Sequence, residues 1–357
     1  VAERTREDFD RLAELGISVQ GKIVLARYGR NFRGYKAKYA EEAGAGGLII
    51  YSDPADNGYV RGLVYPEGPF ANGSTIQRGS LLTLDYTGDP LTPFEPALPG
   101  DAVQRLHPDS VAGMHRIPVL PLPYDAAAEI LSRMKGAPVP AGWQGGLPFT
   151  YRLEGGPELR VHMEVNQPME QVRISNVVGK ITGAEFPDEW ILLGCHHDAW
   201  EFGAVDPNSG TAALLTLAEA LGELAKAGHR PRRSILIAHW DAEEYGILGS
   251  TEWVEQFREE LGAKAIAYLN ADGAVSGPNF YGSASPSLKQ PLIDAARAVP
   301  YPGTQHSVYD HWAGRKGQGA PEPPVGNLGG GSDHVGFYAH VGVPSLNAGF
   351  SGAHGIY

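Results

Sequence analysis

"EWILLGCHHDAWEFGAVDPNSG", residues 189–210, joins an apolar run to a dense group of histidines and carboxylates. The run EWILLG predicts a buried β-strand. His196, His197 and Asp198 follow that strand directly, and Asp206 comes eight residues after Asp198. In open parallel sheets, ligands bind beyond the carboxyl ends of the strands. This segment therefore predicts an α/β fold with a binding site at one edge of its sheet.

The chain on either side repeats the same pattern of apolar strands and helices. SILIAHW (234–240) and AIAYLNAD (265–272) read as further strands, and GTAALLTLAEALGELAKAG (210–228) reads as a helix. The leucines of that helix recur at helical spacing at Leu214, Leu217, Leu221 and Leu224. Strands that alternate with helices predict a mostly parallel sheet covered by helices.

The ends of these strands also carry carboxylates. Glu243 and Glu244 follow the second strand in WDAEEYG, and Asp272 ends the third in NAD. Without partners, these acidic side chains would repel one another, and burial of each one would cost on the order of several kcal/mol. Divalent metal ions resolve this conflict, and a mixture of imidazole and carboxylate ligands favours zinc over magnesium or calcium. One histidine with several carboxylates suits a pair of metal ions that activates water for hydrolysis of an acyl bond.

The first half of the chain has a different character. GKIVLARYG (21–29) and GLIIYSDPAD (47–56) predict strands, with FRGYKAKYAEEAGA (32–45) as a helix between them. YDAAAEILSRMKG (124–136) predicts an amphipathic helix, and RVHMEV (160–165) and RISNVVGKI (173–181) resemble strands. A change of composition near residue 170 suggests domains at 1–170 and 171–357, although one large α/β domain is also compatible with this length.

Composition excludes several classes of partner. Asp and Glu outnumber Lys and Arg by 41 to 29, the formal charge is −12, and no basic run is long enough to track a nucleic-acid backbone. No apolar stretch approaches the roughly 18 residues that cross a bilayer. The only cysteine, Cys195, cannot form an internal disulfide.

Taken together, the motifs resemble those of the glutamate carboxypeptidase II-like co-catalytic zinc peptidases, which are relatives of the transferrin receptor. The resemblance spans nearly the whole chain, from GKIVLARYG and YSDPAD through QRG, GDPLTP, HHDAWEFGAVDPNSG, RPRRSILIAHWDAEEYGILGSTEW and YLNAD to LGGGSDH. It implies a protease-associated apical domain at 1–170. It also implies a zinc-peptidase catalytic domain at 171–357, truncated at its C-terminus.

The resemblance implies a role for each residue of the metal site. His196 and Asp272 would bind one zinc, Glu244 the other, and Asp206 would bridge the two. Glu243 would be the general base that deprotonates the metal-bound water, and Asp198 would orient His196. The family's fifth ligand, a histidine, would come immediately after Tyr357. His306 in HSVYD resembles its motif but precedes GGGSDH, so it is not predicted to be that ligand.

The resemblance also implies a structural calcium ion that clamps the apical domain onto the catalytic domain. Its ligands would be Thr92, Glu95, Glu252 and Glu255. An ordinary solvated helix face is the alternative for Glu252 and Glu255.

Four residues match the pocket that receives the terminal residue of the substrate: Phe32, Arg33, Gly331 and Tyr357. A guanidinium binds a free carboxylate well, although Arg33 could equally be a surface arginine. Phe70 replaces an asparagine of the glutamate-specific members, so a strict preference for acidic peptides is not implied.

The resulting prediction is a two-zinc metallopeptidase that removes the C-terminal residue of small peptides. The alternatives are an aminopeptidase of the same fold and a non-catalytic receptor like the transferrin receptor. The resemblance further implies an extracytoplasmic location, a membrane anchor outside this chain and a homodimer of the full-length parent. His197, His334, His354 and Cys195 are not predicted to have a catalytic role.

Overall fold

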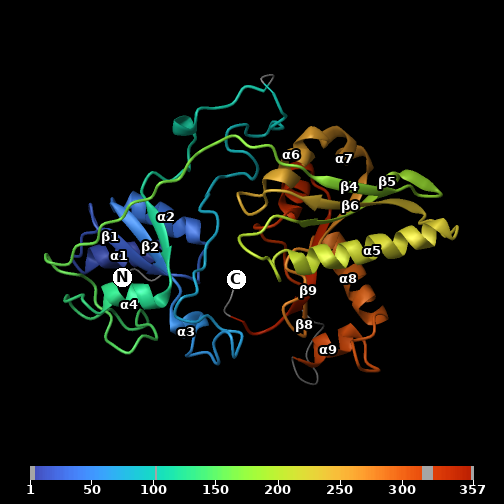
Figure 1. Ribbon diagram of the computed structural model, residues 1–357. Coiled ribbons are helices and arrows are strands. Elements are labelled where there is room, and N and C mark those ends of the chain that lie inside the picture. The colour runs from blue at the N-terminus through green and yellow to red at the C-terminus, as the bar shows by residue number, and fades with distance from the viewer. Residues whose placement is uncertain (1–4, 101–102, 316–324, 355–357) are drawn as a thin grey trace. The chain divides into compact units, whose positions relative to one another are not determined.

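The computed structural model describes residues 5–100, 103–315 and 325–354, which form two compact units (Figure 1). The first unit contains the described residues of 1–85, 111–171 and 353–357, and the second those of 86–110 and 172–352. The chain passes from one unit to the other at residues 85–86, 110–111, 171–172 and 352–353. Residues 86–110 belong to the second unit, because the carboxylate of Glu252 accepts hydrogen bonds from the backbone N–H groups of Asp89 and Ala97, at 2.6 Å each.

The first unit is built on a parallel sheet of three strands in the order β1-β2-β3. Its elements are α1 (Arg6–Glu14), β1 (Ile23–Arg27), α2 (Arg33–Glu42), β2 (Gly47–Tyr51), α3 (Pro54–Asn57), β3 (Val119–Leu122) and α4 (Tyr124–Leu131). Alternate residues of β2 enter different cores, as strand periodicity requires. Leu48 and Ile50 pack with α2 on one face, and Ile49 and Tyr51 pack with α4 on the other.

A buried polar network ties the strand ends of this unit to residues 143–151. Asp53 is fully buried and accepts hydrogen bonds from the backbone N–H groups of Ala55 and Gly146 and from the Tyr151 hydroxyl. The Arg27 guanidinium lies 3.7 Å from Asp53 and donates to the carbonyl of Trp143. Burial of these groups is tolerated because each carboxylate oxygen of Asp53 has a donor.

The second unit is built on a mixed, mostly parallel sheet of six strands in the order β4-β6-β5-β7-β9-β8. Strands β6, β5, β7 and β9 run parallel, and β4 and β8 are antiparallel at the edges. Its elements are η1 (Pro108–Ser110), β4 (Val177–Ile181), β5 (Phe186–His196), α5 (Asn208–Lys226), β6 (Arg233–Trp240), α6 (Leu248–Gln256), α7 (Arg258–Lys264), β7 (Ala265–Asn270), β8 (Asn279–Ala284), α8 (Pro286–Ala298), α9 (Val308–Gly314), η2 (Gly336–His340) and β9 (Ser345–Ser351).

Helices cover both faces of this sheet. Leu214 of α5 packs with Cys195 and Ile237 on one face. Val254 of α6 and Leu261 of α7 join Trp190, Leu192, Leu236, Trp240, Tyr268 and Phe337 in a separate core. Residues such as Leu192 and Cys195 enter different cores because successive side chains of β5 point to opposite faces. The result is a sheet with helices on both sides, which confirms the predicted fold class.

Most of the predicted elements are present, with two differences. RVHMEV (160–165) forms no strand, and within RISNVVGKI only Val177–Ile181 is extended in the sheet. Among the described residues, no helix combines the length and apolarity that a membrane span requires. The predicted anchor, homodimer and extracytoplasmic location stay predictions.

Replacement of Asp53 tests the importance of the buried network. Asp53→Ala would leave the Tyr151 hydroxyl and the Gly146 N–H buried without an acceptor, and each orphaned donor costs about 1–3 kcal/mol. We expect the free energy of unfolding to fall by about 3 kcal/mol in urea titrations followed by circular dichroism. Replacement of the exposed Glu67 by alanine is the control and should change it by less than about 0.5 kcal/mol. Equal stability of the two variants would contradict this account.

Candidate metal centre

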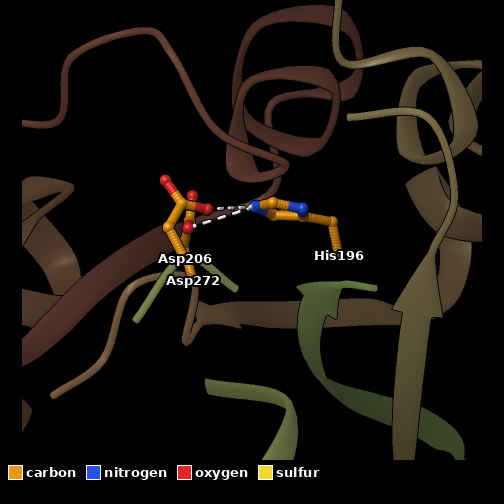
Figure 2. A group of neighbouring side chains, drawn as sticks. All are labelled: His196, Asp206 and Asp272. Carbon is orange, nitrogen blue, oxygen red and sulfur yellow. Dashed lines mark hydrogen bonds and ion pairs between the residues drawn. The ribbon is translucent and has the colours of Figure 1, made fainter. Parts of the chain in front are cut away.

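His196 lies at the centre of the site. It is the last residue of β5, which runs between β6 and β7, and its side chain is only 1% exposed. Its Nδ1 is 2.9 Å from the carbonyl oxygen of Asp198. Its Nε2 is 3.0 Å from Oδ1 of Asp206 and 3.2 Å from Oδ1 of Asp272, and Figure 2 shows both carboxylates facing the same ring nitrogen.

The two aspartates reach this point from different elements. Asp206 lies in the loop between β5 and α5, and Asp272 follows β7 by two residues. Among the residues that the structure describes, His196, Asp206 and Asp272 are the one group of three or more His, Cys, Asp or Glu whose ligand atoms all lie within 4.8 Å of one another. The sheet therefore brings together three of the residues predicted to bind zinc.

The hydrogen bonding of His196 fits a cation at this position. The carbonyl of Asp198 can only accept, so Nδ1 carries a proton, while Nε2 faces the two carboxylate oxygens. Oδ1 of Asp206 is buried and faces Nε2 of His196 at 3.0 Å. Burial lowers the pKa of His196, but its contacts with Asp198, Asp206 and Asp272 outweigh this effect and raise it. The site therefore requires a positive charge, and its donor set of nitrogen and oxygen suits zinc.

Glu243 and Glu244 follow β6 and are held by Asp198. The Asp198 carboxylate accepts the backbone N–H of Glu243 at 2.9 Å and that of Glu244 at 3.1 Å. Ala242, just before them, has a φ of 56°, a left-handed conformation that is uncommon for a residue with a side chain. Asp198 also lies 3.4 Å from Nδ1 of His196, so one carboxylate joins the β5 and β6 ends of the site.

The two glutamates differ in their surroundings. Oε2 of Glu243 is 3.9 Å from Nε2 of His196, and burial raises the pKa of Glu243 well above its ordinary value. Burial and the charge of Asp206 raise the pKa of Glu244 to about 7. Glu244 thus lies within the electrostatic reach of Asp206, although it is outside the group of three closest ligands.

Two residues near the site were not identified from the sequence. Asp333 is fully buried, and burial raises its pKa to about 7. Ser332 donates its hydroxyl proton to Oδ2 of Asp272. Both lie in LGGGSDH, and the polar residues that follow this run of glycines are the sequence feature that could have identified them as part of the site. Their burial depends on distant segments and could not be inferred locally.

The four residues predicted to bind calcium all belong to the second unit, whereas the sequence assigned Thr92 and Glu95 to the apical domain. Oγ1 of Thr92 and both carboxylate oxygens of Glu255 are buried without a hydrogen bond. Burial raises the pKa of Glu252 to about 7 and that of Glu255 to about 8. Glu95 is exposed. The described contacts therefore attach residues 86–110 to α6 inside one unit.

The predicted substrate-pocket residues are distributed over the chain. Arg33 is the first residue of α2, and its guanidinium lies 5.1 Å from the centre of the Phe32 ring and against Gly79. A Cβ atom at residue 79 would overlap Nη2 of Arg33. Gly331 has a φ of 93° beside Ser332. Tyr357 lies outside the described residues.

Four residues that the sequence did not assign to catalysis are also outside the group of three closest ligands: His197, His334, His354 and Cys195. His197 is exposed, and its Nε2 is 3.2 Å from the carbonyl oxygen of Ser175. His334 contacts the carbonyl of Gly329 at 2.8 Å, and His354 is exposed. Burial raises the pKa of Cys195 to about 12, which disfavours the thiolate that a nucleophile needs.

Several known proteins are similar to this chain. "Glutamate carboxypeptidase 2 homolog" of Caenorhabditis briggsae is 40% identical over 363 residues, which cover 95% of this chain and 46% of that protein. "Aminopeptidase NAALADL1" of Mus musculus is 37% identical over 367 residues, which cover 97% of this chain and 48% of that protein. The chain thus spans about half the length of these curated relatives.

A solved structure, that of BSAP, a zinc aminopeptidase from Bacillus subtilis, is 19% identical, with a TM-score of 0.47 over 98% of this chain and 63% of that one. The PA domain model matches residues 1–83, and the model of peptidase family M28 matches residues 176–357. The second match includes every residue of the site built around His196. This chain therefore belongs to peptidase family M28 and carries a PA domain in its first half.

Proposed function

We propose that the protein is a two-zinc metallopeptidase that removes the C-terminal residue of small peptides. The observation that carries this proposal is the convergence of Nε2 of His196 with Oδ1 of Asp206 and of Asp272 at the carboxyl ends of β5 and β7. Zinc is the metal that membership of peptidase family M28 implies. The donor set described above fits it.

In this proposal, His196 and Asp272 would hold one zinc ion, Glu244 would hold the other, and Asp206 would serve both. When bound, zinc supplies Lewis-acid polarisation of the scissile carbonyl and activation of water. Asp198 keeps His196 oriented through the 2.9 Å contact between its carbonyl oxygen and Nδ1. The same residue holds the backbone of both glutamates, so the positions of ligand and base are coupled.

Glu243 acts as the general base. Its buried carboxylate takes a proton from the attacking water while the water oxygen bonds to the carbonyl carbon. When the C–N bond breaks, Glu243 passes that proton to the leaving amine and is regenerated. No covalent intermediate with the enzyme forms.

Arg33 is assigned to the free carboxylate of the substrate. Its planar guanidinium can bind a carboxylate through two parallel hydrogen bonds. Gly79 supports this role, since it leaves the space in which the guanidinium lies. The name of the Caenorhabditis briggsae relative, a glutamate carboxypeptidase 2 homolog, agrees with it. Phe70 stands where the glutamate-specific members have an asparagine, so the proposal does not extend to a strict acidic preference.

An aminopeptidase is the second candidate, favoured by the name of the Mus musculus relative. It shares the zinc ligands and Glu243, but it would recognise the free amine of the substrate instead of its carboxylate. A non-catalytic receptor is the third candidate. It would use neither Glu243 nor a bound metal ion.

We also propose that Thr92, Glu95, Glu252 and Glu255 bind a structural calcium ion. The buried oxygens of Thr92 and Glu255 that lack hydrogen bonds support this assignment, since calcium prefers oxygen ligands. Such an ion would fix residues 86–110 to α6.

The zinc site and the general base can be tested separately. Asp206→Ala should lose bound zinc, whereas Glu243→Gln should keep zinc and lower kcat by about 10²- to 10⁴-fold. Zinc would be measured by mass spectrometry, and turnover by hydrolysis of free dipeptides, in the same preparations of each variant. Exposed Glu219→Gln is the matched control and should retain both zinc and turnover. Absence of zinc from the wild type would overturn the peptidase proposal.

End-blocked dipeptides distinguish the two kinds of peptidase. If the protein is a carboxypeptidase, amidation of the C-terminus should abolish cleavage, while acetylation of the N-terminus should not. Arg33→Ala should raise KM for free-carboxylate peptides more than it lowers kcat, and Gly79→Ala should do the same by displacing the guanidinium. The reverse blocking pattern would establish an aminopeptidase.

Calcium binding predicts a gain in stability. Addition of calcium should raise the thermal midpoint of the wild type but not that of Glu255→Gln, because a ligand that binds the folded state stabilises it. Glu260→Gln, at an exposed position of α7, is the control and should respond like the wild type. A wild type that is indifferent to calcium would refute this assignment.

A further inference from the structure

A line of hydrogen-bonded side chains runs from the core of the second unit to Asp272. Nε1 of Trp240 donates to the Tyr268 hydroxyl at 2.9 Å, and that hydroxyl donates to Oδ1 of Asn270 at 3.2 Å. Nδ2 of Asn270 donates to Oγ of Ser332 at 2.8 Å, and the Ser332 hydroxyl donates to Oδ2 of Asp272. Side chains from β6, β7 and the segment before η2 thus form a series of hydrogen bonds that ends at the carboxylate of Asp272.

The chemistry of the members fixes the direction of every bond. An indole N–H can only donate, so the Tyr268 oxygen accepts from Trp240 and its proton is directed to Asn270. The Asn270 amide group then points its N–H at Ser332, whose own proton is left for Asp272. A flipped Asn270 would leave the Tyr268 proton without an acceptor and would draw the Ser332 proton away from Asp272. Only the observed order satisfies every buried group.

The line is anchored in a part of the core that excludes water. Trp240 and Tyr268 are 0% exposed, Asn270 is 3% exposed and Ser332 is 5% exposed. The ring of Phe337 stacks on that of Tyr268, with ring centres 4.0 Å apart and planes inclined by 11°. These neighbours restrict the positions of the polar groups, because close packing leaves few alternative rotamers.

The two carboxylate oxygens of Asp272 therefore make different contacts. Oδ2 receives the Ser332 proton, while Oδ1 receives the backbone N–H of Gly273 at 2.6 Å and faces Nε2 of His196 at 3.2 Å. Rotation of the carboxylate would break the bond from Ser332. Oδ1 is consequently held on the side of His196 and Asp206, where a cation would lie.

We propose that the line Trp240–Tyr268–Asn270–Ser332 positions Asp272 to bind the metal through Oδ1, which makes Ser332 and Tyr268 positioning residues of the metal site. This inference rests on the proposed zinc-dependent function. It assigns a role to polar residues of YLNAD and LGGGSDH beyond the ligand itself.

The test is zinc affinity, measured by competition with a chromophoric chelator in the 357-residue chain. Ser332→Ala should weaken zinc binding by about 10- to 100-fold, as loss of a partner that orients a ligand typically does. Tyr268→Phe should weaken it by less, because Asn270 and Ser332 remain. Ser332→Thr retains the hydroxyl and should bind zinc like the wild type. The visible spectrum of the cobalt-substituted protein should shift in Ser332→Ala, since the ligand geometry changes.

Ser345→Ala is the matched control. Ser345 is also fully buried in this sheet, but its hydroxyl donates to the carbonyl of Val343. It should leave the zinc affinity and the cobalt spectrum unchanged. Equal zinc affinity and equal cobalt spectra in the wild type and Ser332→Ala would overturn the inference, and a loss confined to the stability of the zinc-free chain would do the same. A wild type that binds no zinc would overturn the proposed function as well.

Discussion

The electrostatic conflict around the imidazole of His196 is the constraint on which the rest of the site depends. Its Nε2 has oxygens of Asp206, Asp272 and Glu243 within 3.0, 3.2 and 3.9 Å, and His196 itself is buried while these carboxylates are at least partly buried. Like charges at such distances in a low dielectric repel strongly, and burial alone already disfavours each of them. The arrangement is stable only when a positive charge occupies it. The fold therefore holds these groups in place against their mutual repulsion.

Fixed hydrogen-bond donors at the ends of adjacent strands hold the carboxylates in place despite their mutual repulsion. Asp198 is held by two backbone N–H groups after β6, and Asp272 by Gly273 and Ser332 after β7. Asp206 differs, because its buried Oδ1 faces Nε2 of His196 at 3.0 Å and has no backbone N–H donor. An oxygen without a fixed backbone donor would be available to the metal ions of the proposed function. The difference in hydrogen bonding thus parallels the difference in the proposed roles.

Part of the site could be predicted from the sequence because its residues lie at the ends of strands. His196, Asp206 and Asp272 could be placed together, since apolar runs mark strands and the carboxyl ends of parallel strands share one edge. The position of residues 86–110 could not be predicted from the sequence. It depends on hydrogen bonds from the backbone N–H groups of Asp89 and Ala97 to Glu252, which is more than 150 residues away in the chain. RVHMEV has strand-forming residues, but it is not paired with any strand of the described sheets, and its Val161 and Met163 pack against the core of the first unit instead. The burial of Asp333 likewise arises from contacts that have no local pattern.

The core of the second unit and its site are linked through the same residues. Trp240, Tyr268 and Phe337 pack together beneath the sheet edge, and the first two also begin the hydrogen bonds that reach Asp272. Beside this core, Ala242 and Ile247 adopt left-handed backbone conformations that cost about 1–3 kcal/mol each. Buried acids and strained backbone both disfavour folding, so the apolar contacts of the core must offset them. A cation that binds the folded site relieves part of this cost, which couples metal binding to stability.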